Sequence, residues 1–144
     1  MTALRHVGIV VRNLDAALGF YCDLLGFREV RAMDESGEFL DSILGLSHAK
    51  VRTVKLAGTS GGQVELLAFQ DPKAQVGPPP PLTRAGPTHI AVTVSDVDGL
   101  YARLRQSGVE CTTPPRVSPD GGAKVTFCRD PDGTYVELVQ VLRP

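Results

Sequence analysis

An approximate internal repeat constrains the fold of this 144-residue chain more than any other feature. The first copy opens with LRHVGIVVRNLDAALGFYCDLLGFREV, and the second opens with PTHIAVTVSDVDGLYARLRQSGVEC. Each copy begins with a β-branched run that holds one histidine, passes through an Asx-rich segment into an amphipathic stretch, and ends that stretch on a glycine. Self-similarity of this kind indicates two copies of one structural unit.

The amphipathic stretch of each copy predicts a helix. Asn13 is a good N-cap for the helix of the first copy, and Ser95 or Asp96 is the N-cap expected for the helix of the second copy. Gly26 and Gly108 are placed to end the two helices. The apolar stripes expected to face the core are Leu14, Leu18, Tyr21 and Leu25 in the first helix, and Val97, Leu100 and Leu104 in the second.

Strand candidates follow each helix, and the last two of each copy are joined by turn sequences. The turns are GTSGG at 58–62 and DPDG at 130–133, and both suit hairpins. Each copy then closes on a strand that contains VEL. Two βαβββ units of the α+β class are therefore predicted, with strands at 27–33, 51–56 and 63–69 in the first and at 109–112, 123–128 and 134–141 in the second.

A proline-rich and glycine-rich segment at 70–86 separates the two copies and predicts an extended linker, with a recognition segment as the alternative. The expected organisation is one domain over 1–144, with a first module at about 3–69 and a second at about 87–142. The stretch 34–49 has no counterpart in the second copy. Its FLDSILGL sequence predicts a short helix, and such insertions often carry substrate contacts.

Composition argues against several classes of partner. A net charge of −1 gives no general attraction to nucleic acid or to anionic membranes. No run approaches the roughly 20 apolar residues that a membrane span needs, and no cleavage site follows the first apolar stretch. The three cysteines are far apart in sequence and form no CxxC motif. We therefore expect a cytoplasmic protein with reduced thiols that acts on a small molecule.

Four residues at repeat-equivalent positions predict a metal site. His6 and His89 lie at the first strands of the two copies, and Glu65 and Glu137 lie in the closing strands. One strand histidine alone is more often a hydrogen-bonded structural residue. Two imidazoles and two carboxylates suit zinc, or with added water nickel, cobalt, manganese or iron, and the two carboxylates balance the charge of a divalent ion.

The segments HVGIVVRNLDAALGFYCDLLGF and RDPDGTYVELV resemble the vicinal oxygen chelate superfamily, which includes glyoxalase I, methylmalonyl-CoA epimerase, extradiol dioxygenases and antibiotic-resistance proteins. The resemblance implies paired modules that form a U-shaped eight-stranded mixed sheet around a divalent metal, and commonly a homodimer. It also implies that the four residues named above are the ligands, in a set like that of bacterial glyoxalase I. The shared chemistry is stabilisation of an enolate formed by proton removal next to a carbonyl.

Some positions depart from the patterns of individual members. Glyoxalase I usually has an arginine and an asparagine, which hold glutathione, where this chain has Val10 and Phe69. Methylmalonyl-CoA epimerase normally has glutamine where this chain has Glu65, and its catalytic glutamate aligns with His48. A histidine near neutral pH can serve as a general base.

The sequence therefore predicts a metal-dependent isomerase, epimerase or glyoxalase-type lyase that acts on a small carbonyl or thioester substrate. Glu65 or Glu137, after leaving the metal, or His48 would serve as the base. One alternative is a binding or resistance protein that sequesters a small molecule such as an antibiotic. Another is an extradiol-type dioxygenase, although these enzymes normally lack a ligand at the position of Glu65.

Overall fold

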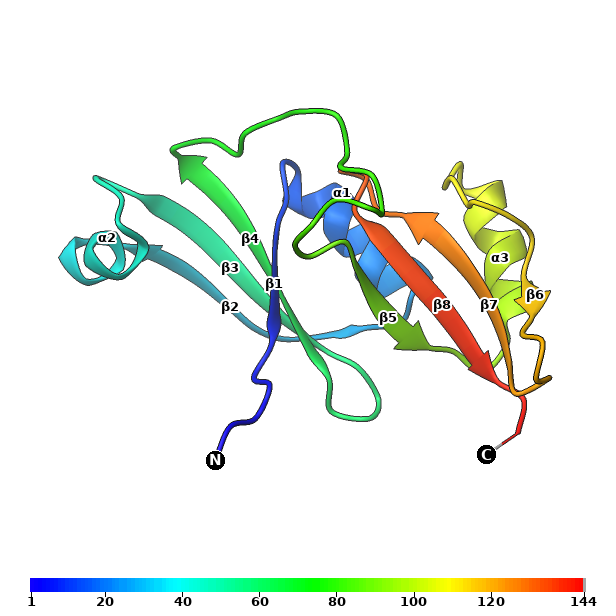
Figure 1. The fold of residues 1–144 in the computed structure, drawn as a ribbon. Helices are drawn as coiled ribbons and strands as arrows, with labels where there is room; N and C mark the ends of the chain where they lie inside the picture. Colours follow the sequence, from blue (N-terminus) through cyan, green and yellow to red (C-terminus); the bar gives the residue numbers. More distant parts are fainter. Residues whose placement is uncertain (144) are drawn as a thin grey trace. The chain divides into compact units, whose positions relative to one another are not determined.

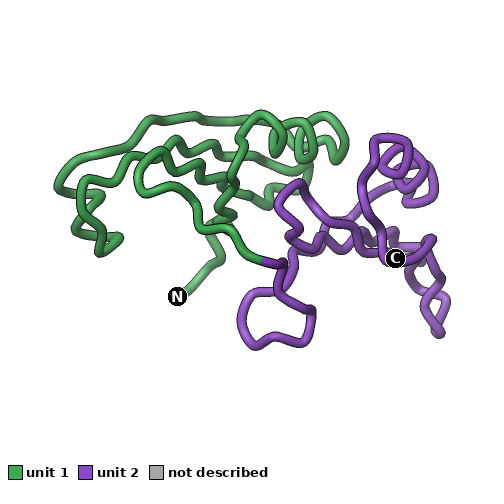
Figure 2. Tube along the Cα trace, turned by 90° about the horizontal axis from the view of Figure 1, so that it is seen from above, with its two compact units in different colours: residues 1–77 green, residues 78–144 purple. Residues whose placement is uncertain are grey.

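A computed structural model describes residues 1–143 and contains two compact units, Met1–Gly77 and Pro78–Pro144, each built around a four-stranded sheet (Figures 1 and 2). In the first unit the elements are β1 (Val7–Val10), α1 (Leu14–Leu18), η1 (Gly19–Leu24), β2 (Arg28–Ser36), α2 (Glu38–Leu44), β3 (Lys50–Ala57) and β4 (Gln63–Asp71). In the second they are β5 (His89–Thr93), α3 (Val97–Gln106), β6 (Arg116–Val117), β7 (Ala123–Arg129) and β8 (Tyr135–Val141).

The two sheets have the same topology. Their strand orders are β1-β4-β3-β2 and β5-β8-β7-β6. In each sheet the first strand runs parallel to the last strand, and every other neighbouring pair is antiparallel. The α+β class and the two βαβββ units are thus confirmed, and the two hairpin turns at 58–62 and 130–133 join antiparallel neighbours as expected.

The first helix begins as the sequence predicts but continues differently. The side chain of Asn13 accepts a hydrogen bond of 3.0 Å from the backbone N–H of Ala16, so it caps the helix. After Leu18 the chain widens into the π-helical turn η1, which rotates the following side chains. Phe20 and Tyr21 are buried within this turn, next to the buried Ala17 of α1, whereas the other members of the expected stripe are only half-buried.

The second helix matches its prediction closely. Asp96 is the N-cap, and its carboxylate accepts a hydrogen bond of 3.0 Å from the backbone N–H of Gly99. The expected residues Val97, Leu100 and Leu104 are buried. Gly108 follows the C-cap with a φ of 80°, a left-handed conformation that suits glycine.

One expected strand is wrong. Residues 109–112 form no strand, and only an isolated bridge joins Cys111 to Cys128. The two-residue strand β6 lies further along the chain. Pro114 and Pro115 explain the delay, because a proline has no N–H to donate to a neighbouring strand. The other strands lie within a few residues of their predicted bounds, and the insertion contains the expected short helix, α2.

Alternation along β3 and β4 separates a core face from an open face in the first unit. Val54, Leu56 and Leu66 are almost fully buried, and α1 packs against β4. Successive side chains of a strand point to opposite faces, so Lys55 and Glu65 lie on the opposite side of the sheet. Residues 72–88 contain no helix or strand and connect the two sheets. Within residues 1–143, no helix has the length and apolarity required to span a membrane.

Replacing Leu104 by alanine tests the core of the second unit. Leu104 is fully buried in α3, so we expect the free energy of unfolding to fall by about 2–5 kcal/mol in urea denaturation. Gln106→Ala, at an exposed position of the same helix, is the control and should change it by less than about 0.5 kcal/mol. Equal changes in the free energy of unfolding for the two substitutions would contradict the assignment of Leu104 to the buried face of α3.

Candidate metal and active site

The parallel pairing of β1 with β4 brings His6 to Glu65. Gly8 is the register partner of Glu65, and His6 lies two residues before Gly8, on the same side of the sheet. The imidazole Nε2 of His6 is 3.7 Å from Oε1 of Glu65. Glu65 is only 15% exposed, so the pair is largely shielded from water.

The second unit repeats this arrangement with the same register. Ala91 is the partner of Glu137 in the parallel pair of β5 with β8, and His89 lies two residues before Ala91. Nε2 of His89 is 3.4 Å from Oε2 of Glu137. The structure therefore places all four predicted ligands in two equivalent histidine–glutamate pairs.

The residues directly opposite the two glutamates differ, and neither was among the predicted site residues. Lys55 faces Glu65 across the β3–β4 hairpin, with Nζ 3.7 Å from Oε2. Phe127 occupies the equivalent position opposite Glu137, and its ring lies edge-on to that of His89 at a centroid distance of 5.2 Å. Counting outward from each hairpin turn would have found both residues, because the turn fixes the register.

His48, the third candidate base, lies apart from the His6–Glu65 pair of its own unit. It is exposed two residues before β3, with a left-handed φ of 56°, whereas Glu65 pairs with Lys55 near the other end of that strand. The intervening strand is roughly 15–20 Å long. The structure therefore does not bring His48 to this pair.

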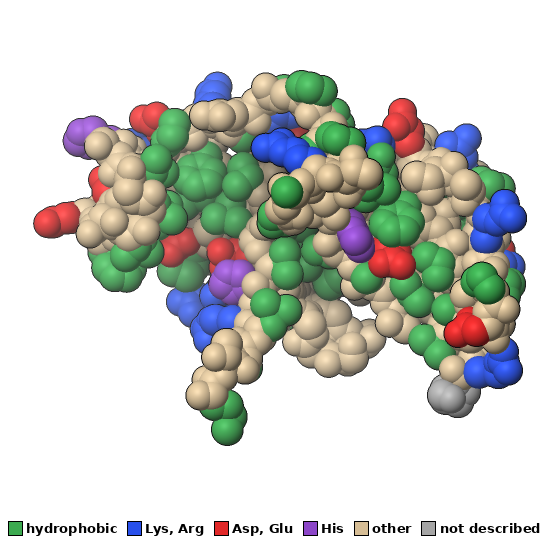
Figure 3. Space-filling view, viewed as in Figure 1, with side chains coloured by type: hydrophobic (Ala, Val, Ile, Leu, Met, Phe, Trp, Pro, Cys, Tyr) green, Lys and Arg blue, Asp and Glu red, His purple; other side chains and the backbone are tan. Residues whose placement is uncertain are grey.

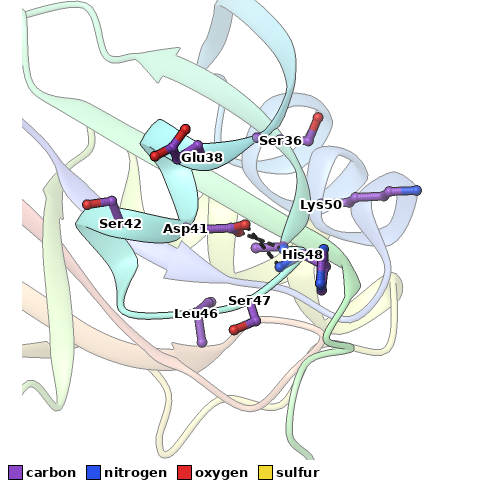
Figure 4. A pocket seen from close by; sticks show the side chains of 10 residues that line it. Ser36, Glu38, Asp41, Ser42, Leu46, Ser47, His48 and Lys50 are labelled. Atoms are coloured by element: carbon purple, nitrogen blue, oxygen red, sulfur yellow. Dashed lines mark hydrogen bonds between the residues drawn. The ribbon is translucent and has the colours of Figure 1, made fainter.

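His48 instead borders a pocket of about 680 Å³ beside α2. Figure 4 shows Asp41 of α2 directed at the backbone of the segment that follows the helix. Its carboxylate accepts hydrogen bonds from the backbone N–H groups of His48 (3.0 Å) and Ala49 (2.8 Å). These bonds hold the connection between α2 and β3 in place.

The insertion also covers one end of the sheet face that carries Glu65. Leu40 of α2 is buried together with Ala49 and Val51, and Leu67 and Phe69 pack against this cluster. Leu67 and Phe69 follow Glu65 at alternate positions of β4, so all three face the same way. The face thus changes from polar at the His6–Glu65 pair to apolar beneath α2.

Comparison with known proteins identifies the family. The profile of the glyoxalase/bleomycin resistance protein/dioxygenase superfamily matches residues 3–138. This chain belongs to that superfamily. This chain is 31% identical over 139 residues to a probable lactoylglutathione lyase from Synechocystis, and the match covers 95% of this chain and 94% of the relative. It is 29% identical over 138 residues to the uncharacterized protein YaeR of Escherichia coli, covering 95% of each.

Its fold is also that of a solved member. A glyoxalase family protein from Bacillus cereus superimposes with a TM-score of 0.90 at 24% identity, covering 99% of this chain and 95% of that protein. The α+β fold is therefore the glyoxalase-like fold of the superfamily.

The donor atoms of this superfamily member fit a divalent ion. In tetrahedral or octahedral coordination, bonds of about 2.0–2.2 Å place neighbouring donors roughly 3.0–3.5 Å apart, close to the separations in the two pairs. Nδ1 of His6, the ring nitrogen not paired with Glu65, is buried without a hydrogen-bond partner, so His6 lacks the second contact that usually orients a metal-binding imidazole. Nδ1 of His89 lies 2.8 Å from Oγ1 of Thr88, the kind of contact that orients a metal-binding imidazole.

Each pair supplies two donors only. In the part of the chain that the structure describes, no three His, Cys, Asp or Glu side chains cluster closely enough to hold an ion. Histidine side chains do lie next to acidic side chains in the space-filling view (Figure 3). Convergence of the two pairs on one ion stays a prediction.

Zinc titration of histidine variants tests that prediction. We expect one ion per chain, and His6→Ala or His89→Ala should each weaken binding at least 10-fold, because even residues that only orient a ligand contribute about 10–100-fold. His48→Ala is the matched control and should bind like the original protein. Binding of two zinc ions per chain would contradict a shared site. So would a loss of zinc affinity in His48→Ala equal to that in the other two variants.

Replacing Lys55 should strengthen zinc binding, in contrast to replacing a histidine of the site. Its ammonium lies near Glu65 and repels a cation bound there, so Lys55→Met should tighten zinc binding by about 3–10-fold at low ionic strength. Lys50→Met, at an exposed position near the far end of β3, should leave the affinity unchanged. Weaker binding by the Lys55 variant would show that the lysine supports the site.

Proposed function

We propose that this protein is a metal-dependent lyase or isomerase that moves a proton at the carbon next to a carbonyl group. The observation that carries the proposal is the histidine–glutamate pair, repeated with one register in both units. Such a repeat is hard to explain by structural needs alone, because each pair leaves its imidazole and carboxylate outside good hydrogen-bonding distance.

We propose that His6, Glu65, His89 and Glu137 hold one divalent ion, with the pairs meeting within one chain or between the two chains of a homodimer. Two glutamates would neutralise its charge, and the open coordination positions would receive the substrate. A divalent ion held there would polarise the substrate's carbonyl oxygen as a Lewis acid.

A glutamate of the site is the proposed base. Oε1 of Glu65 faces His6, and Oε2 faces Lys55, so the two oxygens have separate partners. One oxygen can therefore accept a proton while the other keeps its contact with its own partner. Lys55 also offsets negative charge that develops on a substrate beside it. Glu137 is the equivalent candidate in the second unit. The position of His48 at the far end of β3 supports no part of this step.

The proposed substrate is a small carbonyl compound that does not depend on glutathione for binding. The relative from Synechocystis is named as a probable lactoylglutathione lyase, which supports the reaction class. Val10 and Phe69 stand where glyoxalase I usually holds glutathione, and neither side chain can donate a hydrogen bond. Phe69 is moreover packed against the α2 cluster, so this end of the face is suited to an apolar group.

Hydrogen exchange at the substrate carbon tests the proposal. The zinc-loaded or nickel-loaded protein should incorporate deuterium from D₂O next to the carbonyl of 2-oxoaldehyde-derived or thioester probes, followed by NMR. Glu65→Gln or Glu137→Gln, whichever residue is the base, should slow exchange by about 10²–10⁴-fold. His48→Gln is the control and should exchange at the original rate.

Two other outcomes would overturn this function. Metal-dependent oxygen consumption with a catechol, in the absence of hydrogen exchange, would indicate a dioxygenase. Unchanged affinity for a small apolar ligand in Glu137→Ala, again without exchange, would indicate a binding or resistance protein.

A further inference from the structure

Cys111 and Cys128 lie opposite each other in the second unit, although 16 residues separate them in sequence. An isolated antiparallel bridge pairs the two residues. The flanking hydrogen bonds run from Thr112 N–H to Phe127 C=O (2.9 Å) and from Arg129 N–H to Glu110 C=O (3.0 Å). The cysteines themselves therefore occupy a non-hydrogen-bonded pair.

This kind of pair has the right dimensions for a covalent bond between the two sulfurs. The Cα atoms of a non-hydrogen-bonded antiparallel pair are about 4.5 Å apart, with both side chains on one face. Disulfides span Cα separations of about 4.4–6.8 Å. We propose that Cys111 and Cys128 form a reversible cross-strand disulfide, which fastens the segment after α3 to β7.

The surroundings of the pair already hold the backbone in position for this bond. Oγ1 of Thr126 donates a hydrogen bond of 2.6 Å to the carbonyl of Thr113, one residue further from the bridge than the bond between Thr112 and Phe127. Bond formation therefore needs little backbone movement. Cys128 alternates along β7 with Phe127 and Arg129, so the sulfurs lie on the sheet face opposite the ring that contacts His89.

The two thiols differ in accessibility, which sets the order of reaction. Cys111 is half-buried, whereas Cys128 is only 1% exposed. Burial raises the pKa of Cys111, and the Arg105 guanidinium partly offsets the rise. Burial, with smaller contributions from Cys111 and Asp130, raises the pKa of Cys128 to about 12. Cys111 is thus the thiol that meets an external reagent, and reaction is slow at neutral pH.

The chemistry needs a small-molecule disulfide as oxidant. The Cys111 thiolate attacks one sulfur of the reagent, the reagent's S–S bond breaks, and one thiolate leaves. The Cys128 thiol then loses its proton and attacks the Cys111 sulfur of the mixed disulfide, which releases the second thiolate. The two cysteines lose two electrons and two protons, and the reagent is reduced to two thiols.

Oxidised glutathione at about pH 9 is the probe, applied to the folded full chain. We expect peptide mapping to join Cys111 to Cys128, and reductant to reverse the change. The thermal midpoint should rise by roughly 5–10 °C, because the bond restricts the unfolded chain.

Single-cysteine variants define the pair. Cys22→Ser is the matched control and should still lose its two remaining thiols. Cys128→Ala should stop at a mixed disulfide on Cys111, and Cys111→Ser should leave Cys128 unreacted. In the original protein, the proposal would be overturned if both thiols survived or if Cys111 stopped at a mixed disulfide. It would also be overturned if the bond joined Cys22 or linked two chains.

Discussion

The parallel pairing of the first strand with the last strand of each unit is the constraint on which the site depends. Parallel neighbours need a crossover, and here the crossover contains the helix and the intervening hairpin strands of the unit. The pairing fixes Gly8 beside Glu65 and Ala91 beside Glu137, and thereby places a histidine two residues earlier on the same face. A slip of one residue would turn each glutamate into the core.

Much of this arrangement follows from local sequence signals. Asn13 and Asp96 are strong N-caps, the two hairpin turns are rich in glycine and aspartate, and the buried positions of α3 follow a helical period. The two histidine–glutamate pairs were predicted because the repeat aligned them. Within one copy alone, a histidine at a strand start and a glutamate after a turn would have carried little information.

Other features could not be predicted because they depend on packing or on spatial neighbours. The π-helical turn η1 changes which side chains of the first helix are buried, and no local motif in residues 19–24 specifies it. The register positions of Lys55 and Phe127 can be counted from the hairpin turns, but their side-chain contacts with the site residues depend on the folded structure. These two residues, with the α2 insertion, make the halves of the repeat chemically unequal: one pair lies beside a cation and the other beside an aromatic ring.

X-ray absorption spectroscopy of the protein loaded with one equivalent of zinc tests the central claim most directly. If the two pairs share one ion, the spectrum will show two imidazoles together with oxygen donors, at about 2.0–2.2 Å. His6→Ala and His89→Ala will each reduce the imidazole count to one. A shell with a single imidazole in the original protein would show that each pair acts separately, and would contradict the account.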